Sequence, residues 1–387
     1  MRSPVLASRL QGFGTTIFAE MSALAARTGA INLGQGFPDT DGPAEVLAAA
    51  RDAISTGRNQ YPPGRGIPEL RDAVAAHQQH WYGLSYDSET EVLVTAGATE
   101  AIAAALLALC EPGDEVIALE PTYDSYAASV AMAGGILVPV RLEFPEHRLD
   151  PVRLRAAVTD RTRLLLLNSP HNPTGHVLSA EELAAVAEIA IEHDLLVVSD
   201  EVYEHLTFDR VRHIPIATLP GMAERTVTIS SGGKTFSTTG WKTGWACGTA
   251  ELVTAVTTAK QFLTYVNGGP FQYGIAAGLA LPDDRIVAIG TQLERQRDIL
   301  VDGLRAAGLD PAPSEGTYFV TADVAALGAT DSLAFCRDLP DRCGVVAIPS
   351  QVFYGDPTGV ETLVRFAFCK RPEVLTEAAT RLASLAG

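Results

Sequence analysis

The stretch Ser230-Ser231-Gly232-Gly233-Lys234-Thr235-Phe236 directly follows an apolar run, Thr226–Ile229, that has the pattern of a buried strand. A lysine just beyond a strand end, among small residues, is placed to lose its hydration shell. Desolvation favours the neutral amine, which is a nucleophile that can hold an aldehyde as a Schiff base. Lys242 lies eight residues further on and would lower the pKa of Lys234 in the same direction. An isolated lysine is usually a solvated surface charge, so the strand and the glycines carry the functional interpretation.

Strand-like runs alternate with helical patterns on both sides of this stretch, from about residue 90 to residue 265. Several runs are continuously apolar, as expected when both faces of a sheet are covered. The alternation predicts an α/β fold, in which a large domain has three layers and a mostly parallel sheet. The predicted strands are Glu91–Thr95, Glu115–Leu119, Ile136–Val140, Arg163–Asn168, Leu195–Ser199 and Thr226–Ser230.

The pattern changes after about residue 281. A long helix, roughly 286–307, precedes short strands near 317–321, 345–348 and 363–368 and a final helix, which is typical of a smaller α+β domain. We therefore predict a loop-rich N-terminal arm over residues 1–40, a large domain over 41–280 and a small C-terminal domain over 281–387.

Composition limits the classes of function. The formal net charge of −17 over 387 residues argues against binding to nucleic acid or to an anionic membrane. The five cysteines form no CxxC pair and are odd in number, which favours a reduced, cytoplasmic protein. The N-terminus lacks the apolar core of a signal peptide, and the longest apolar run, 101–110, is too short to span a bilayer. No spacing of ligand residues predicts a metal site.

Ligands of parallel sheets bind beyond the carboxyl ends of the strands, and the first such segment is Thr95-Ala96-Gly97-Ala98-Thr99. It leads from a strand into an alanine-rich helix. Small residues allow close approach of the backbone, and the free N–H groups at a helix start favour a phosphate. A tight turn capped by Thr99 is the structural alternative.

Two further strand ends offer polar groups. The loop 168–175 contains two prolines and Asn172, whose side-chain amide could donate to a phenolic oxygen on the ring of a bound ligand. Asn-Pro also favours a simple turn, which is the alternative. Asp200 ends a buried apolar strand, where a carboxylate is costly without a partner such as a protonated ring nitrogen. Tyr203 could reach the same phenolic oxygen as Asn172. The alternative for Asp200 is a cap on a following helix.

Two residues outside these loops complete the set. Tyr123 follows another strand and could stack on a planar ring, or could be a core tyrosine. Arg365 stands in the apolar run 363–368, where its guanidinium needs an anionic partner and matches a carboxylate bidentately. A structural ion pair is the alternative for this arginine.

Together these segments resemble the class I/II pyridoxal-phosphate-dependent aminotransferases of fold type I. The resemblance rests on the Asn-Pro-x-Gly loop, the run Ser-Asp-Glu-Val-Tyr, and Ser-x-x-Lys-x-Phe followed by Gly-Trp-Lys-x-Gly-Trp, in that order. It extends from the run 32–39 to Arg365. The runs 18–25 and 34–39 are similar to a subgroup that includes kynurenine, glutamine and methionine transaminases and succinyldiaminopimelate aminotransferases.

The resemblance implies pyridoxal 5'-phosphate as cofactor, with a role for each matching residue. Lys234 would hold the cofactor aldehyde and act as the catalytic base, Asp200 would pair with the pyridine nitrogen, and Tyr203 and Asn172 would bind the phenolic oxygen. Many members carry an arginine where this chain has Lys242. The remaining implied roles are stacking by Tyr123, phosphate binding by Gly97, Ala98, Thr99, Ser231 and Lys242, and substrate-carboxylate binding by Arg365, Asn172 and Gly36.

The family also implies a homodimer with shared active sites. Tyr61 would then reach the phosphate in the neighbouring subunit, and the arm would pack on the small domain or on that subunit. The expected reaction is ping-pong transfer of an amino group from an L-amino acid to a 2-oxo acid such as 2-oxoglutarate. N-succinyldiaminopimelate and an aromatic or sulfur amino acid are the candidate donors.

Three other functions can be set against these motifs. Ser231–Lys234 and Lys242–Gly244 match the S-x-x-K and K-T-G motifs of penicillin-binding enzymes, but these two motifs lie too close together, and Ser199-Asp200 precedes the nucleophile instead of following it. A pyridoxal-phosphate-dependent C–S β-lyase that cleaves cysteine conjugates would use the same Lys234 and Asp200, so this alternative stays open. A purely regulatory role lacks a basic patch or a DNA-binding module.

Overall fold

The computed structural model describes residues 5–14 and 16–386, and its centre is a seven-stranded sheet in the order β2-β8-β7-β6-β5-β3-β4. The six predicted strands all form, with ends within one residue of those predicted. They are β2 (Val92–Thr95), β3 (Glu115–Glu120), β4 (Ile136–Arg141), β5 (Thr162–Asn168), β6 (Leu196–Asp200) and β7 (Thr226–Ser231). The strands from β4 to β7 are parallel to one another, which confirms a mostly parallel sheet.

The seventh strand, β8 (Gly244–Cys247), lies antiparallel between β2 and β7 and was not predicted. Its four residues, Gly-Trp-Ala-Cys, follow the Lys242 segment directly and include none of the β-branched residues that favour a strand. Because β8 runs opposite to β7, residues 232–243 leave and re-enter the sheet at the same edge. This connection includes the short helix α8 (Gly232–Thr235).

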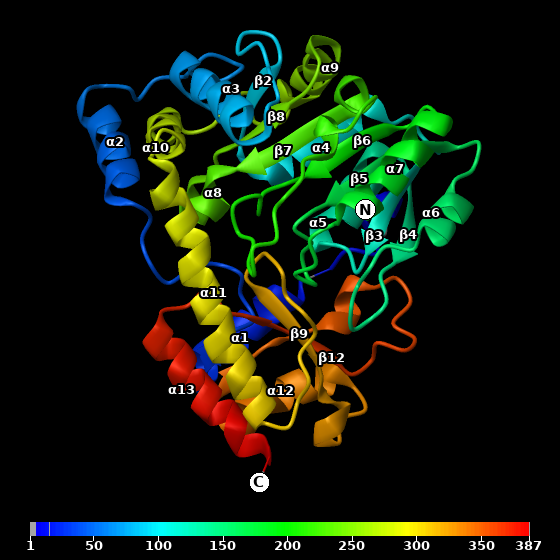
Figure 1. Ribbon diagram of the computed structural model, residues 1–387, viewed down its shortest axis with the longest axis vertical. Helices are drawn as coiled ribbons and strands as arrows, with labels where there is room; N and C mark the ends of the chain where they lie inside the picture. The colour runs from blue at the N-terminus through cyan, green and yellow to red at the C-terminus, as the bar shows by residue number, and fades with distance from the viewer. Residues whose placement is uncertain (1–4, 15, 387) are drawn as a thin grey trace.

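Helices cover both faces of the sheet, as the continuously apolar strands require (Figure 1). In β5, Leu164 and Leu166 pack into one apolar cluster, and Leu165 and Leu167 pack into another on the opposite face. The helices of this part are α2 (Ala44–Ser55), α3 (Pro68–Tyr82), α4 (Gly97–Leu109), α5 (Asp124–Ala133), α6 (Pro151–Ala157), α7 (Ala180–Glu192), α9 (Ala250–Lys260) and α10 (Gly269–Leu279). Helix α7 begins with the capping box expected from Ser179 and Glu182.

The C-terminal part has its own apolar core and a three-stranded antiparallel sheet in the order β11-β12-β9. The long helix α11 descends toward it from the level of the large sheet (Figure 1). The strand predicted at 345–348 divides into β10, which pairs with β1, and β11, which pairs with β12. The elements of the C-terminal part are α11 (Asp283–Ala306), β9 (Phe319–Asp323), α12 (Ser332–Cys343), β10 (Val345–Val346), β11 (Ile348–Pro349), β12 (Leu363–Ala367) and α13 (Pro372–Ala383). The domain boundary near residue 281 stays a prediction.

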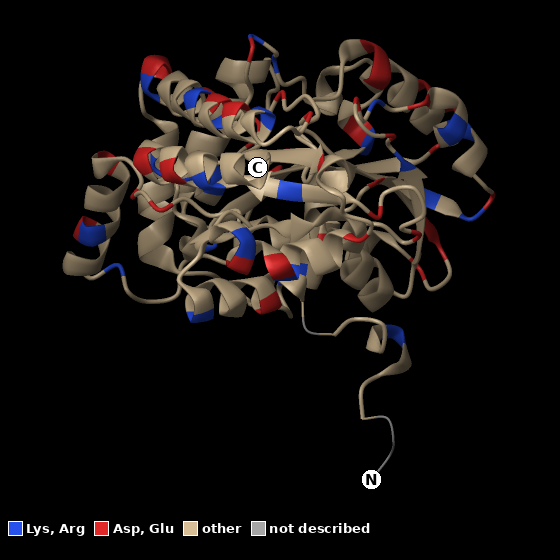
Figure 2. Cartoon of the chain, turned by 90° about the horizontal axis from the view of Figure 1, so that it is seen from below, with Lys and Arg blue, Asp and Glu red and all other residues tan. Residues whose placement is uncertain are grey.

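The N-terminal region is more ordered than predicted. Helix α1 (Ile17–Thr28) and strand β1 (Ile31–Asn32) form where a loop-rich arm was expected, so that prediction was wrong over these residues. Met21, Ala25 and Leu33 are buried in the C-terminal core, which explains why these residues form regular structure. Residues 5–14 project from the body of the protein (Figure 2). Residues 1–4 and 15 of the predicted arm lie outside the described residues.

Charged residues of both signs are interleaved over the view of Figure 2. In the described part of the chain, no helix combines the length and the apolar character that crossing a membrane requires.

Candidate active site

A pocket at the carboxyl edge of the large sheet gathers most of the predicted site residues. Those lining it are Gly97, Ala98, Thr99, Tyr123, Asn172, Asp200, Tyr203, Ser231, Lys234 and Lys242, together with Asn168 and Thr239, which were not predicted. They come from the ends of β2, β3, β5, β6 and β7 and from the β7–β8 connection. The topology therefore places together side chains that are up to 145 positions apart in the sequence (97 to 242).

Lys234 stands on α8, and its Nζ donates a hydrogen bond of 2.9 Å to the hydroxyl of Tyr318. That hydroxyl in turn donates to the carbonyl of Gly36 at 2.5 Å. Burial is the main reason that the pKa of Lys234 is lowered to about 8. Cys369 and Asp200 oppose the shift, and Lys242 adds to it. The amine is therefore close to the protonation balance that a nucleophile and proton carrier needs.

Asp200 ends β6 and is 4% exposed. Tyr126 donates a hydrogen bond of 2.7 Å to one of its carboxylate oxygens, and the amide of Val202 donates at 3.3 Å to the other. Burial is the main reason that the pKa of Asp200 is raised to about 6, and the hydrogen bond from Tyr126 limits the rise. The segment after Asp200 is a turn and not a helix, so the capping alternative fails. A buried acid of this kind is suited to a cationic ring nitrogen.

A set of donors lies at the opening of α4. Gly97 starts this helix with a φ of +77°, and a Cβ there would lie 3.2 Å from Nζ of Lys242. Nζ of Lys242 approaches the hydroxyl of Thr99 at 3.4 Å. The Ser231 hydroxyl donates to the carbonyl of Thr243 at 3.2 Å on the same side. A lysine, two hydroxyls and the free N–H groups of a thirteen-residue helix make this corner of the pocket suited to a phosphate.

Arg365 of β12 is 1% exposed and connects the C-terminal part to the pocket. It donates to Oδ1 of Asn172 at 3.1 Å and to the carbonyl of Gly34 at 3.0 Å, and it lies 3.9 Å from the centre of the Phe319 ring. Among the described residues it makes no ion pair with a carboxylate, and its Nε has no hydrogen-bond partner.

Burial lowers the pKa of Arg365 to about 10, so the guanidinium stays charged at neutral pH. A buried cation with an unused donor calls for an anionic ligand, and the structural ion-pair alternative fails within the described chain. The carbonyl that accepts from Arg365 belongs to Gly34, and the role of Gly36 at the substrate carboxylate stays a prediction.

The aromatic residues fall into two groups. Tyr203 is 2% exposed and lies edge-on to Tyr318, and Tyr123 lines the pocket and lies edge-on to Tyr126. Burial raises the pKa of Tyr123 to about 12, so this phenol is neutral and can donate. Tyr61 is different, because it is outside the pocket, 80% exposed and in contact with Tyr265. One chain therefore does not bring Tyr61 to the site.

Sequence reasoning missed Tyr126 and Tyr318. Tyr126 lies three residues after Tyr123, in the first turn of α5, and only the fold shows that it turns toward Asp200. Tyr318 precedes β9 in the other half of the molecule and has no motif around it. A donor beside a predicted buried carboxylate is a chemical requirement, but the sequence does not say which residue meets it.

A separate cluster away from this pocket contains His77, Glu204 and His205, whose donor atoms lie within 4.8 Å of one another. The Nε2 atoms of the two histidines are 2.6 Å apart, which is a hydrogen-bond distance. Two nitrogens on one zinc ion, each bound at about 2.0–2.1 Å, would lie farther apart than that. The prediction of no metal site stays a prediction.

The pocket fits pyridoxal 5'-phosphate on three counts. The amine of Lys234 has a lowered pKa, as covalent attachment to an aldehyde requires. Asp200 offers a buried acid held by Tyr126, and the start of α4 offers phosphate donors that Lys242 approaches closely because position 97 has no side chain. The buried donor of Arg365 that lacks a partner marks where a substrate anion would bind.

Comparisons with known proteins show the family of the chain. Residues 28–382 match the family model described as aminotransferase class I and II. A methionine aminotransferase of Escherichia coli is 41% identical, with 98% of each chain covered. A kynurenine–oxoglutarate transaminase of Dictyostelium discoideum is 37% identical, with 96% of this chain and 94% of the relative covered. The solved structure of N-succinyldiaminopimelate aminotransferase from Mycobacterium tuberculosis is 56% identical and has a TM-score of 0.96, with 98% of this chain and 100% of that chain covered.

Proposed function

The chain belongs to the class I and II aminotransferases, a pyridoxal-phosphate-dependent family of fold type I, and from this premise we propose that its amino donor is N-succinyldiaminopimelate and its acceptor 2-oxoglutarate. The observation that carries the choice of donor is the 56% identity, over nearly the whole of both chains, to a protein with that name. The relatives named for methionine and kynurenine are less similar, at 41% and 37% identity. Aminotransferase relatives do not favour the β-lyase alternative.

We propose the following roles for the residues of the pocket. When bound, the cofactor supplies an aldehyde for covalent attachment and a ring that withdraws electrons from the substrate α-carbon. Asp200, held by Tyr126, keeps a negative charge beside the ring nitrogen, and Lys242, Thr99, Ser231 and the start of α4 hold the phosphate. Asn172 and Tyr203 offer donors to the phenolic oxygen, and Tyr123 packs on the ring.

The remaining residues act on the substrate. Arg365 binds the α-carboxylate through its unused donor and is oriented by Asn172 and Gly34. Lys234 takes the proton from the substrate α-carbon, and its pKa of about 8 suits both release and uptake near neutral pH. Tyr318 donates to the Gly36 carbonyl and accepts from Lys234, so it fixes the amine between proton transfers. Ping-pong kinetics should follow, because the amino group is stored on the enzyme between the two substrates.

The distal carboxylate of the proposed donor needs a cation, and the sequence offers Arg58 and Arg65 near the Tyr61 loop. Arg65 donates to the carbonyl of Thr90 at 2.8 Å and to the hydroxyl of Thr254 at 3.3 Å, so it is engaged away from the pocket. Arg58 is exposed and lies 5.7 Å from the centre of the Tyr273 ring. Of the two, Arg58 is the better candidate.

The proposal is tested by comparing kcat/KM for a panel of donors with 2-oxoglutarate as acceptor. The panel contains N-succinyldiaminopimelate, diaminopimelate as its unsuccinylated control, methionine, kynurenine and a cysteine conjugate. We expect N-succinyldiaminopimelate to exceed every other donor by about tenfold or more, which corresponds to one additional charged contact. A higher value for methionine or kynurenine would contradict the choice of donor. Formation of pyruvate and ammonia from the cysteine conjugate in the absence of an oxo acid would favour the β-lyase alternative.

We also propose a homodimer and a cytoplasmic location. Val5 on the projecting segment is 88% exposed, Phe262 is 84% exposed and Tyr61 is 80% exposed. The loops that carry Phe262 and Tyr61 are linked through Lys260 and Tyr265. Large apolar side chains exposed in this way favour burial against a second subunit. Mass measurement by light scattering tests the dimer. If Tyr61 serves the partner's site, mixing inactive Tyr61→Ala and Lys234→Ala subunits should restore activity through hybrids with one intact site.

A further inference from the structure

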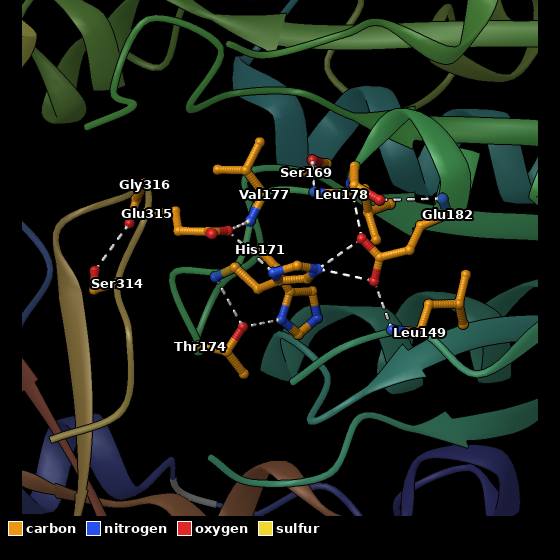
Figure 3. Close-up of polar contacts among 12 residues, drawn as sticks. Leu149, Ser169, His171, Thr174, Val177, Leu178, Glu182, Ser314, Glu315 and Gly316 are labelled. Carbon is orange, nitrogen blue, oxygen red and sulfur yellow. Dashed lines mark hydrogen bonds and ion pairs between the residues drawn. The ribbon is translucent and has the colours of Figure 1, made fainter. Parts of the chain in front are cut away.

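His176 lies between two carboxylates that come from different parts of the molecule. Its Nε2 is 3.0 Å from both carboxylate oxygens of Glu182 at the start of α7, and its Nδ1 is 3.2 Å from Oε2 of Glu315, which lies in the loop before β9. The imidazole and Glu182 are 5% and 6% exposed, while the Glu315 side chain is 31% exposed. Figure 3 shows the side chains of Glu182 and Glu315 extending toward one another from opposite sides.

Both ring nitrogens of His176 face acceptors, so both must carry a proton, which makes the ring an imidazolium. Burial opposes this charge, but the hydrogen bonds to Glu182 and Glu315 outweigh burial and raise the pKa of His176 to about 9. Two other histidines nearby, His147 and His171, have pKa values lowered by burial to about 4 and about 3, so they are neutral. Arg148 is the other cation acting on Glu315.

The same two loops are joined by backbone contacts. The carbonyl of Gly175 accepts from the amides of Glu315 and Gly316 at 2.9 and 2.8 Å. Gly175 has a φ of +79°, and a Cβ there would lie 2.6 Å from the hydroxyl of Ser314, so only glycine allows the loops to approach this closely. Oε2 of Glu315 also accepts from the amide of Val177 at 3.2 Å.

Each loop carries a residue of the pocket a few positions away. Asn172, four residues before His176, orients Arg365. The backbone N–H of Asn172 donates to Oδ1 of Asn168 at 2.7 Å. Tyr318, three residues after Glu315, contacts Lys234. The ion pair of His176 with Glu315 therefore lies behind the pocket, where the sheet part and the C-terminal part of the site meet.

We propose that His176 is a positioning residue. As a cation bridging Glu182 and Glu315, it holds the segment 172–176 and the segment 315–318 at the separation that substrate binding needs. The proposal rests on the proposed function in one respect, because it takes Arg365 and Asn172 as the substrate-carboxylate site. Neither carboxylate partner of His176 lines the pocket, so the bridge acts through the loops and not on the substrate.

The test uses two substitutions that each keep one half of the bridge. The amide nitrogen of glutamine can occupy the Nε2 position, so His176→Gln keeps a donor toward Glu182 and loses the contact to Glu315. The amide nitrogen of asparagine can occupy the Nδ1 position, so His176→Asn keeps the contact to Glu315. Glu315→Gln removes the charge from the other side, at a more exposed residue that folding tolerates. Glu45→Gln, which breaks an exposed ion pair between α2 and α11, is the control.

KM and kcat for donor and acceptor are measured on each holoenzyme, with the donor that the wild type uses best. We expect His176→Gln and Glu315→Gln each to raise KM about 3–10-fold with kcat within about twofold, and the double variant to be no worse than either single variant. His176→Asn, which keeps the contact to Glu315 but loses the charge, should raise KM less than His176→Gln does, and Glu45→Gln should change KM less than twofold. Thermal unfolding of the apoproteins confirms that each variant folds.

Three results would overturn the proposal: unchanged KM in both His176→Gln and Glu315→Gln, additive effects in the double variant, or equal damage from His176→Asn and His176→Gln. Arg365→Ala separates this failure from failure of the proposed function. If Arg365→Ala raises KM while His176→Gln does not, the bridge is wrong and the carboxylate site stands. If Arg365→Ala itself leaves KM unchanged, the carboxylate site is wrong.

Discussion

The pocket around Lys234 and the bridge around His176 both bury charged groups, but they treat those charges in opposite ways. In the pocket, burial is not fully compensated, so the pKa of Lys234 falls to about 8, that of Asp200 rises to about 6 and that of Arg365 falls to about 10. In the bridge, hydrogen bonds outweigh burial, so the pKa of His176 rises to about 9 and that of Glu182 falls to about 2.

The difference separates groups that change state from groups that hold a structure. A residue that must exchange a proton or accept a ligand needs its charged form to be weakly held, and its missing partner is supplied by the ligand. A residue that fixes two loops needs its charged form to be strongly held. On this criterion Lys234, Asp200 and Arg365 are assigned to chemistry and His176 to positioning, although all four are largely surrounded by protein.

The strongest test of the comparison removes the amine itself. Lys234→Ala should lower turnover by at least about 10⁴-fold, because it removes both covalent attachment and the proton carrier. Steady-state transamination and the absorbance of the bound cofactor are the two measurements. Lys234→Arg is the matched control, since it keeps a cation at this position and should be equally inactive. Retained turnover in Lys234→Ala would refute the assignment of this lysine.

A smaller effect is expected at the anion site. Arg365→Ala should raise KM for donor and acceptor by about 10²-fold, because it removes the charged partner of the substrate carboxylate, and a hydrogen bond between charged groups contributes roughly 1.5–3 kcal/mol. Arg365→Lys keeps the charge but loses the planar fork, and we expect it to recover only part of the binding. KM is measured after circular dichroism confirms folding, and a KM equal to that of the wild type would show that the carboxylate binds elsewhere.

The smallest effect concerns the pH dependence of stability at the bridge. The folded-state pKa of His176 lies above its unfolded value near 6.5, so its stabilising contribution is fully present below pH 6.5 and is lost as the pH rises through about 9. The wild type should therefore exceed His176→Gln by ~1–2 kcal/mol in free energy of unfolding at pH 6, and this difference should shrink by pH 10. Urea unfolding of both proteins across this range measures it. A difference that is constant with pH would mean that His176 is neutral when folded.

Much of the large sheet could be predicted because its strands are buried on both faces. Runs such as Thr162–Asn168 are apolar on every residue that faces a helix layer, so their pattern is visible without any knowledge of neighbours. β8 escaped prediction because it contains no β-branched residue, whereas the equally short β2 contains two valines and a threonine. α1 escaped because its stability comes from packing on β10 and α12, which lie more than 300 residues further along the chain.

Most of the predicted site residues share one physical property, which is that each follows a strand at the carboxyl edge or stands in an apolar strand. Gly36 and Tyr61 do not, and only the family resemblance supplied them. Asp200, Asn172 and Arg365 were found in this way. Tyr126 and Tyr318 were not, because they approach the pocket from a helix and from a loop whose direction only the tertiary structure fixes. His176 was not singled out either, since its importance comes from two glutamates, one of which is 139 residues away.

The connection between β7 and β8 starts and finishes on one edge of the sheet, and it carries both Lys234 and Lys242. Both ammonium groups therefore lie on a single short connection, independently of the order of the other strands. The whole segment from Ser231 to Gly244 could be exchanged between related proteins without changing the strand order of the sheet. The spacing between covalent anchor and anion contact would travel with it as one transplantable unit.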